Sequence, residues 1–394
     1  MRAALGIGIM IIVAGAAMAD DRMSRTIGKA LFERAWVPAP SSTRANDGLG
    51  PLFNARSCAS CHAGLERMPI VTDAAGIVMS DNLVLRLSDR NGEADPTYGR
   101  QLQTASVAGI EPEGRIALSK HGPVPRDLTR GGVDPSTYLG ARLAPALRGL
   151  GLLEAVPDAA ILERADPNDR DGDGISGRAN IVTAHVGVSR IGRFGWKGSA
   201  ANLSDMTEAA FSLDLGLSTP GRPAPWGDCG EKQPECRTAP HGGNWTEPEI
   251  TGELVAMIRD YLTGVAAPAQ AGATPGEGEA VFASIGCAAC HTPALRSPKG
   301  PVRAYTDLLL HDMGDGLDDG ATEPGVGPGE WRTAPLWGIS RILASGARFL
   351  HDGRAATLEE AILFHGGEGS GARARYLALD ARERERLLAF LSTL

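Results

Sequence analysis

Two pentapeptides of the same form lie far apart in the chain, CASCH at residues 58–62 and CAACH at residues 287–291. This C-x-x-C-H spacing is typical of c-type haem attachment, in which two thiols form thioethers to the haem vinyl groups and the adjacent histidine ligates the iron. The sequence therefore predicts two haems. The predicted attachment residues are Cys58, Cys61 and His62 for the first haem and Cys287, Cys290 and His291 for the second.

Two other chemistries use paired cysteines. A zinc site built from the four motif cysteines would satisfy tetrahedral thiolate ligation, but it would leave both histidines without a role. A thioredoxin-like dithiol needs a βαβ context, and neither motif follows an obvious strand. Haem attachment explains the histidines as well as the cysteines, and it is the preferred interpretation.

The two remaining cysteines, Cys229 and Cys236, lie in the Pro/Gly-rich stretch WGDCGEKQPECRTAPHGG. In an oxidising compartment they most simply form a short-loop disulfide, and a reactive thiol pair is the alternative. The N-terminus indicates such a compartment, because Arg2, an apolar run and an A-x-A site at residues 17–19 together form a secretory signal peptide. We expect removal of residues 1–19 and a periplasmic protein, with a retained N-terminal anchor as the alternative.

The composition of the remaining chain predicts its fold class. With 51 glycines, 26 prolines and 5% aromatic residues, we expect short helices joined by long loops and no membrane-spanning segment after the signal peptide. The net charge of −8 argues against nucleic acid and anionic membrane as partners. The prediction is a mostly α protein with two cytochrome c-like haem domains, residues 20–265 and 266–394, each closed by a helix with a capping box at Thr246 or Asp380.

An internal repeat indicates that the two domains arose by duplication. FGWKGSAANL (194–203) and FLHDGRAATL (349–358) share a Phe, a Gly, two Ala and a Leu without a gap. Each is followed by a predicted helix, with Asn202 and Thr357 as the N-cap residues.

Extending the register of this repeat separates the two haems chemically. His365 in the second half corresponds to Ala210 in the first. We expect His365 to be the sixth ligand of the second haem, which suits electron transfer, and the first haem to be open to substrate. Asp214 lies one turn after Ala210, where a carboxylate can move the proton that cleavage of a peroxide O–O bond requires.

Other ligands stay open at this point. Met313 is the rival sixth ligand of the second haem, since thioether ligation is common in cytochromes. His121, His185 and Met68 are candidates to cap the first haem, and such a cap would make the protein an electron relay. Asp214 could also serve only to cap or solvate a helix end.

A cation site is predicted between the two motifs. The loop DRDGDGISGRAN (169–180) places Asp169, Asp171 and Asp173 at positions 1, 3 and 5 of a calcium loop. Position 12 is Asn180 where a bidentate Glu is expected, so a plain Asp/Gly turn is the alternative.

The chain resembles the dihaem oxidoreductase family of peroxidases, formerly labelled thiol oxidoreductases, and more distantly the bacterial dihaem cytochrome c peroxidases. The segments that carry the nearer resemblance are GPLFNARSCASCH, YGRQLQ, DGDGISGRAN, IGRFGWKG, YTDLLLHDMGDGL, EWRTAPLWGIS and FLHDGRAATLEEAILFHGGE.

The distant resemblance to the peroxidases implies roles for particular residues. A peroxidase segment similar to WKGSAANLSDMTEAAFSLDLG leads to a catalytic glutamate, which places Asp214 near that position, although Met206 stands where Gln is typical. Their HDG segment, similar to residues 351–353, precedes the sixth ligand of the electron-transfer haem, which implies that role for His365. In these relatives the N-terminal haem is the peroxidatic one, and a calcium ion lies between the domains.

The sequence thus favours an enzyme that passes electrons from the C-terminal to the N-terminal haem and there reduces hydrogen peroxide or a similar small oxidant. The expected electron donor is a small periplasmic cytochrome or cupredoxin. The alternatives are an electron-transfer dihaem cytochrome that serves a partner protein, and a thiol oxidoreductase that uses Cys229 and Cys236.

Overall fold

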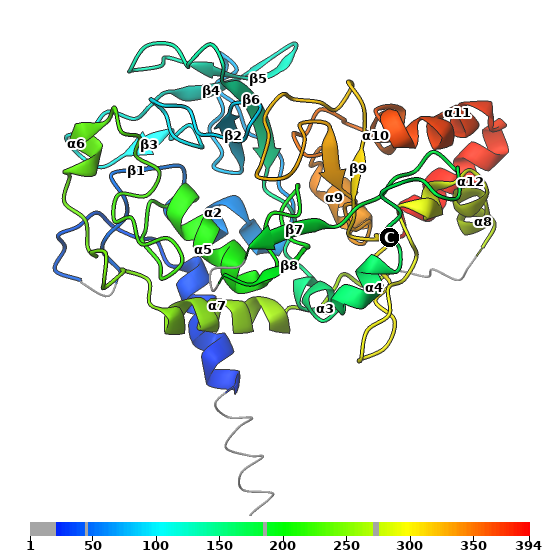
Figure 1. The fold of residues 1–394 in the computed structure, drawn as a ribbon, viewed down its shortest axis with the longest axis horizontal. Coiled ribbons are helices and arrows are strands. Elements are labelled where there is room, and N and C mark those ends of the chain that lie inside the picture. Colours follow the sequence, from blue (N-terminus) through cyan, green and yellow to red (C-terminus); the bar gives the residue numbers. More distant parts are fainter. Residues whose placement is uncertain (1–20, 44–45, 184–186, 271–275) are drawn as a thin grey trace, which may run out of the picture.

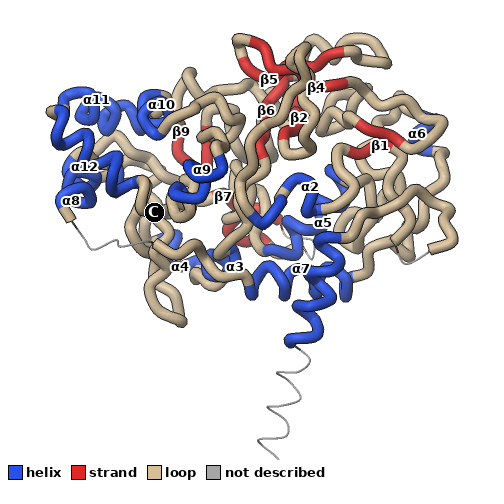
Figure 2. The backbone as a smooth tube through the Cα atoms, turned by 180° about the vertical axis from the view of Figure 1, so that it is seen from behind, coloured by secondary structure: helices blue, strands red, loops and turns tan. Residues whose placement is uncertain are grey.

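The computed structural model describes residues 21–43, 46–183, 187–270 and 276–394. The predicted signal peptide and His185 lie outside these residues. Figure 1 places α2, α5 and α7 in one half of the molecule and α8, α11 and α12 at the opposite end, and Figure 2 shows the same separation from behind. None of the helices within the described ranges is long and apolar enough to cross a membrane.

The helices are short, as the abundance of glycine and proline predicts. Residues 21–33 are helical. The other α-helices are α2 (Cys58–Cys61), α3 (Leu150–Glu154), α4 (Asp158–Leu162), α5 (Leu203–Asp214), α6 (Pro234–Arg237), α7 (Gly252–Gly264), α8 (Glu277–Ser284), α9 (Ile339–Ser345), α10 (Leu358–Leu363), α11 (Ser370–Ala378) and α12 (Ala381–Leu391). The 3-10 helices are η1 (Ala63–Leu65), η2 (Cys287–Ala289) and η3 (Gly367–Gly369).

The described part of the chain also contains five antiparallel two-stranded sheets, which the prediction of a mostly α protein did not include. Four of them belong to the N-terminal half: β4–β5 and β7–β8 join neighbouring strands, whereas β1–β3 and β2–β6 join strands that are distant in the sequence. The pairs are β1 (Leu52–Phe53) with β3 (Ala105–Ser106), β2 (Leu83–Ser88) with β6 (Tyr138–Leu143), β4 (Arg115–Ser119) with β5 (Gly122–Arg126), β7 (Asn180–Thr183) with β8 (Ser189–Gly192), and β9 (Leu310–Asp312) with β10 (Glu330–Arg332).

Three of the four N-caps predicted from the sequence are present. Asn202 and Thr357 cap α5 and α10 through their side chains, and Asp380 forms a capping box on α12, as predicted. The capping box at Thr246 is wrong, since α7 begins after Thr251, whose side chain accepts a hydrogen bond from the N–H of Leu254. Asn244 explains the difference, because its side-chain oxygen holds the N–H of Thr246 in a turn (2.9 Å).

The two segments of the internal repeat adopt the same local structure. The N–H of Phe194 donates to the carbonyl of Ala200 (3.0 Å), and the N–H of Phe349 donates to that of Ala355 (2.7 Å). Each turn then runs into its capped helix, α5 or α10. The duplication of whole domains stays a prediction, which this local equivalence supports.

Two large hydrophobic cores stabilise the two halves of the molecule. The first packs α5 and α7 together with the helical residues 21–33, and it also buries part of the segment 295–309, including Leu295, Val302 and Leu309. The second is aromatic, with Phe282 of α8 lying 5.7 Å from Phe390 of α12 between ring centroids. Residues after 265 therefore contribute to the core of the first half as well as to their own.

Backbone contacts join the halves directly. The N–H of Leu143 donates to the carbonyl of His351 (2.7 Å), and the N–H of Arg332 donates to that of Trp196 (3.0 Å). Arg178 adds a bidentate ion pair with Glu330, with both N–O distances 2.6 Å. These contacts fix residues 143, 178 and 196 of the N-terminal half against residues 330, 332 and 351 of the C-terminal half.

Candidate functional site

The first motif forms a single helical turn. Ser57 caps α2 by accepting a hydrogen bond from the N–H of Ser60 (3.1 Å), which holds Cys58 and Cys61 on that turn. His62 follows at once, and its Nδ1 bonds the carbonyl oxygen of Pro145 (2.9 Å). The ring is thus oriented with Nε2 as the nitrogen available to a metal.

The second motif repeats this arrangement on a different local fold. Cys287 begins η2 after Gly286, which has a φ of 90° that favours glycine. His291 bonds the carbonyl oxygen of Tyr305 through its Nδ1 (3.0 Å). A metal-ligating histidine usually donates its other ring N–H to such an acceptor, so both motif histidines are prepared for ligation through Nε2.

The motif cysteines fit covalent attachment of a cofactor better than the two alternatives. All four are outside disulfides, and they form no common ligand cluster among the described residues, as a shared zinc site would require. Burial raises the pKa of Cys58 to about 12 and that of Cys287 to about 11, which does not suit a reactive dithiol. The described strands pair only in antiparallel sheets, without the parallel βαβ unit of a thioredoxin-like site.

His365 lies opposite His291. Their ring centroids are 6.4 Å apart, and the Nδ1 of His365 bonds the carbonyl oxygen of Ala361 (2.7 Å), which leaves its Nε2 for a ligand. Two imidazoles that bind one metal from opposite sides have centroids about 6.2 Å apart, from about 2 Å for each nitrogen–metal bond and about 1.1 Å from nitrogen to ring centre. This separation is compatible with one iron between the two rings.

The other candidate haem ligands are Met313 for the second haem and His121 and Met68 for the first. Met313 is close to His365, since both side chains approach Gly369. A Cβ added to Gly369 would lie 3.0 Å from the Cβ of His365 and 3.1 Å from the Cε of Met313. His121 is exposed at the turn between β4 and β5. Met68 is half-buried six residues after His62 and its carbonyl accepts from Asn82 (2.9 Å).

Asp214 lies beside the first motif. Its carbonyl oxygen accepts hydrogen bonds from the N–H groups of Asn54 and Ala55 (2.8 and 3.0 Å), so the end of α5 is fixed to the chain just before CASCH. Its carboxylate is close enough to add to the effect of burial in raising the pKa of Cys58 and Cys61. The structure thus brings together an acidic side chain and the first motif from sequence positions more than 150 residues apart.

Gln101 is a neighbour of Asp214 that the sequence did not single out, although it lies in the quoted segment YGRQLQ. Its side chain is fully buried, and its Nε2 lies 2.8 Å from Asp214 Oδ1 and 2.5 Å from Asn54 Oδ1. A buried amide at this distance orients the carboxylate. The two glutamines of YGRQLQ, Gln101 and Gln103, were the signal available in the sequence.

A second unanticipated group lies beside the second motif. His311 is buried, with its Nδ1 2.6 Å from Glu368 and its Nε2 2.9 Å from Asp307. Burial opposes protonation, but these carboxylates and Cys290, whose Sγ is 3.6 Å from Nδ1, carry the pKa of His311 to about 12. The second motif therefore borders a charged imidazolium held by two acids.

The predicted calcium loop faces this region. Asp169, Asp171 and Asp173 have carboxylate oxygens within 4.8 Å of one another, which is compatible with a shared cation. Two of them, Asp171 and Asp173, line a cavity of about 600 Å³ together with Asp307 and His311. Calcium binding stays a prediction.

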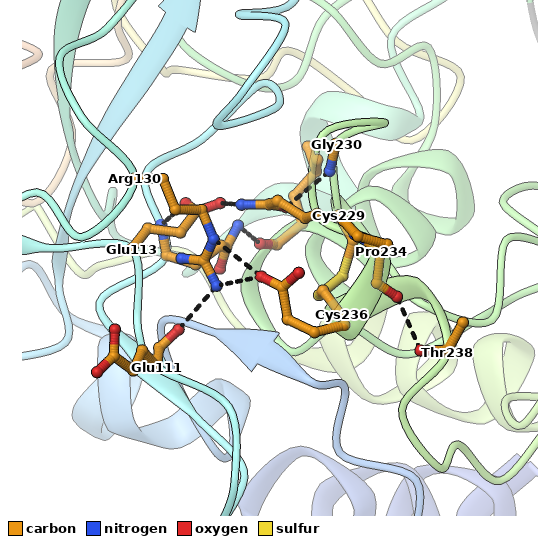
Figure 3. Close-up of a disulfide and its surroundings, with 12 residues drawn as sticks. Glu111, Glu113, Arg130, Cys229, Gly230, Pro234, Cys236 and Thr238 are labelled. Atoms are coloured by element: carbon orange, nitrogen blue, oxygen red, sulfur yellow. Dashed lines mark hydrogen bonds and ion pairs between the residues drawn. A yellow bond between two sulfur atoms is a disulfide. The ribbon is translucent and has the colours of Figure 1, made fainter.

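Cys229 and Cys236 form a disulfide, as expected. Figure 3 shows it beside Glu113 and Arg130. Both cysteines are buried, at 7% and 0% exposure, so the bond is shielded from an external thiol.

Two histidines prepared for metal ligation, each beside a pair of free cysteines, define a protein built to hold redox-active prosthetic groups. Residues 128–394 match the family model described as "Di-haem oxidoreductase, putative peroxidase", a match that includes the second motif and begins after the first. The chain belongs to this di-haem oxidoreductase family, which confirms the family predicted from the sequence. The family's name accounts for two haems and for oxidoreductase activity.

Other comparisons add little. No curated protein matches the chain. A hydrazine synthase of Kuenenia stuttgartiensis, in a structure pressurized with xenon, aligns with 93% of this chain and 92% of its own at 13% identity. The TM-score is 0.38, which is too low to support an argument about fold or function.

Proposed function

We propose that the protein is a periplasmic dihaem peroxidase that reduces hydrogen peroxide or a similar small oxidant. Cys58 and Cys61 would attach the N-terminal haem, with His62 as its ligand. Cys287 and Cys290 would attach the C-terminal haem. When bound, the two haems supply the storage and transfer of electrons.

The proposal assigns different tasks to the two haem sites. His291 and His365 would both ligate the C-terminal haem iron, and the separation of 6.4 Å between their ring centroids supports this; two histidine ligands suit a site that only passes electrons. The matching position in the first half is Ala210, which has no ligating group, so that site is the one open to an oxidant. Electrons would enter at the C-terminal haem from a small cytochrome or cupredoxin.

The observation that carries the proposal is the position of Asp214 beside the first motif. Conversion of hydrogen peroxide to two waters consumes two electrons and two protons, so a proton must leave one oxygen and reach the other as the O–O bond breaks. Asp214 can accept that proton and return it, while the buried amide of Gln101 holds Oδ1 in place (2.8 Å).

The same proposal covers the organisation of the chain. Residues 20–265 and 266–394 would be the two haem domains, with residues 1–19 removed on export. The loop at 169–180 would bind calcium through its three aspartates, next to the cavity that borders the second motif.

The test is the variant Asp214→Asn in haem-loaded protein, with Glu208→Gln as the matched control. Glu208 is a carboxylate on the same helix, but its side chain bonds Thr219 (3.2 Å), away from the motif. We expect Asp214→Asn to lower peroxide turnover by about 10²- to 10⁴-fold at unchanged haem content, since general acid–base catalysis is worth that much. Equal turnover in the two variants would remove Asp214 from the mechanism.

Electron paramagnetic resonance separates the enzyme from an electron carrier. We expect a high-spin ferric signal from one haem, lost when peroxide is added. Two low-spin signals that peroxide leaves unchanged, in both the oxidised and the half-reduced protein, would refute the peroxidase and leave an electron-transfer cytochrome.

A further inference from the structure

Several basic side chains gather where the two halves meet, and burial lowers the pKa of one of them, His351, so that this imidazole is uncharged near neutral pH. We name Arg67, Arg142, Lys197, His351 and Arg354 the junction cluster. The first three belong to the N-terminal half and the last two to the C-terminal half. All but Arg354 are almost completely buried, with exposed fractions of 6% for Arg67, 6% for Arg142, 0% for Lys197 and 3% for His351.

The cluster is built around two tryptophans. The ring of His351 stacks on that of Trp331, with centroids 3.6 Å apart and an interplanar angle of 11°. The Nζ of Lys197 lies 3.7 Å from the Trp331 centroid, and the Cζ of Arg67 lies 5.4 Å from that of Trp196. The aromatic faces attract these cations but carry no net charge to neutralise them.

Two carboxylates pair directly with the cluster. Asp319 binds Arg142, and Asp352 binds Arg354 (2.6 Å). The remaining cations bond neutral groups: Lys197 donates to three backbone carbonyls, and Arg67 donates to the carbonyl of Leu350.

The carboxylates near Lys197 and Arg67 do not offset the cost of burying their positive charges. Asp319, Glu323 and Glu330 act on Lys197, and Asp352 acts on Arg67. Three of these carboxylates already pair with an arginine: Asp319 with Arg142, Asp352 with Arg354 and Glu330 with Arg178. Burial lowers the pKa of Arg67 to about 9 and that of Lys197 to about 7. The positive charge on each of these groups is unfavourable, because burial removes water and the nearby carboxylates do not compensate for that loss.

The cluster also contains unpaired donors. Within the described residues, Nε of Arg67, Nε and Nη2 of Arg142 and Nε2 of His351 are buried without a hydrogen-bond partner. Buried polar groups are nearly always paired in folded proteins. The unpaired guanidinium donors of Arg67 and Arg142 therefore indicate a missing anionic acceptor.

We propose that the junction cluster binds the carboxylates of an anionic ligand, with Arg67 and Arg142 as the principal donors. The planar fork of a guanidinium matches a carboxylate better than other anion shapes. Two sources share this chemistry, namely the propionate groups of a bound haem and a small diffusible anion.

The position in the chain favours the propionates. Arg67 follows His62 by five residues, and Arg142 precedes by three the Pro145 whose carbonyl orients the His62 ring. The inference rests on the two-haem part of the proposed function, and its test does not use peroxide turnover.

The test compares Arg67→Met with Arg193→Met in haem-loaded protein. Arg193 is an equally buried arginine whose Nε is also without a partner, but its guanidinium pairs with Asp158, outside the junction cluster. The reduction potentials of both haems are measured by spectroelectrochemical titration, at increasing concentrations of chloride and acetate. We expect Arg67→Met to lower the potential of at least one haem, because removal of a cation favours the ferric state, and Arg193→Met to leave both unchanged.

The anion series distinguishes the two sources. Propionates are part of the cofactor, so potentials of the unmodified protein that do not respond to chloride or acetate identify them as the ligand. A saturable response that Arg67→Met abolishes identifies a diffusible anion instead. If the potentials and the anion response of Arg67→Met equal those of Arg193→Met, the proposal is wrong.

Stability gives a second readout with opposite signs for the two cases. With a bound anion, Arg67→Met leaves a buried negative charge and lowers the urea midpoint of the haem-loaded protein. Without one, the same change removes an uncompensated buried cation and raises the midpoint. Arg67→Lys keeps the charge and should retain the potential of the unmodified protein, which covers the case in which the methionine variant does not fold.

Discussion

The disulfide between Cys229 and Cys236 offers a test of both structure and function. Asp228, next to Cys229, accepts hydrogen bonds from the N–H groups of Arg100 and Gln101 (2.7 and 2.8 Å). The residue that directly precedes the disulfide loop therefore holds the backbone of Gln101, whose side chain contacts Asp214.

A second contact from the same loop reinforces this. Gln233 lies between the two cysteines, is fully buried and donates to Glu113, which in turn accepts from the N–H of Gln103 (2.6 Å). The disulfide is thus part of a buried framework (Figure 3). We expect it to have a structural role and no part in thiol oxidation.

The perturbation is the double variant Cys229→Ala/Cys236→Ala. The cysteines are seven positions apart. In the chain-entropy model, a closed loop of about eight residues removes about 8 cal/mol/K from the unfolded state, or about 2.5 kcal/mol at 25 °C. We expect the free energy of unfolding to fall by about this amount.

The assay is urea unfolding of the oxidised protein, the double variant and the unmodified protein reduced after unfolding. The last two should share one midpoint, because both lack the crosslink. Haem content and peroxide turnover should persist in the folded double variant. An unchanged midpoint would refute the structural role, and loss of turnover at normal haem content and unchanged fold would favour the thiol oxidoreductase instead.

Two further changes test other parts of the molecule. His365→Met should raise the reduction potential of the C-terminal haem, since a thioether favours the ferrous state more than an imidazole does, and an unchanged potential and spectrum would instead indicate Met313 as the ligand. Burial raises the pKa of Glu113 to about 8, so the folded state keeps a proton that the unfolded state releases near pH 4.5. The free energy of unfolding should therefore fall as pH rises from about 5 to 8, and Glu113→Gln should reduce that slope in denaturation measured across this range, whereas an identical slope would contradict the assignment.

Features with a local cause could be predicted from the sequence. The N-caps at Asn202, Thr357 and Asp380 depend on a side chain and a backbone N–H three residues away, and all three are present. The error at Thr246 has a cause that is only partly local. Asn244 accepts from the N–H of Thr246 and Ser218 accepts from that of Glu249, the two N–H groups that the capping box would use, and Thr251 offers another cap five residues later.

Features that depend on contacts between distant segments could not be predicted. Gln101 meets Asp214 across more than 100 residues, and Lys197 reaches carbonyl groups in the other half of the molecule. No periodicity or spacing encodes such pairs, because a buried amide or ammonium reads in the sequence like a surface residue. For the same reason the packing of residues 295–309 on the first core did not show in the sequence.

The contacts between the halves indicate how two similar halves could carry out different chemistry. Each repeated turn has a carbonyl oxygen that accepts a hydrogen bond from the opposite half. The carbonyl of Trp196 accepts from the N–H of Arg332, and that of His351 accepts from the N–H of Leu143. A duplicated domain that packs on its own copy would leave such reciprocal contacts. The difference between the two haem sites must then come from a few side chains on a common frame. Asp214 at the end of α5, and His365 just after α10, are the two that the proposed division of labour requires.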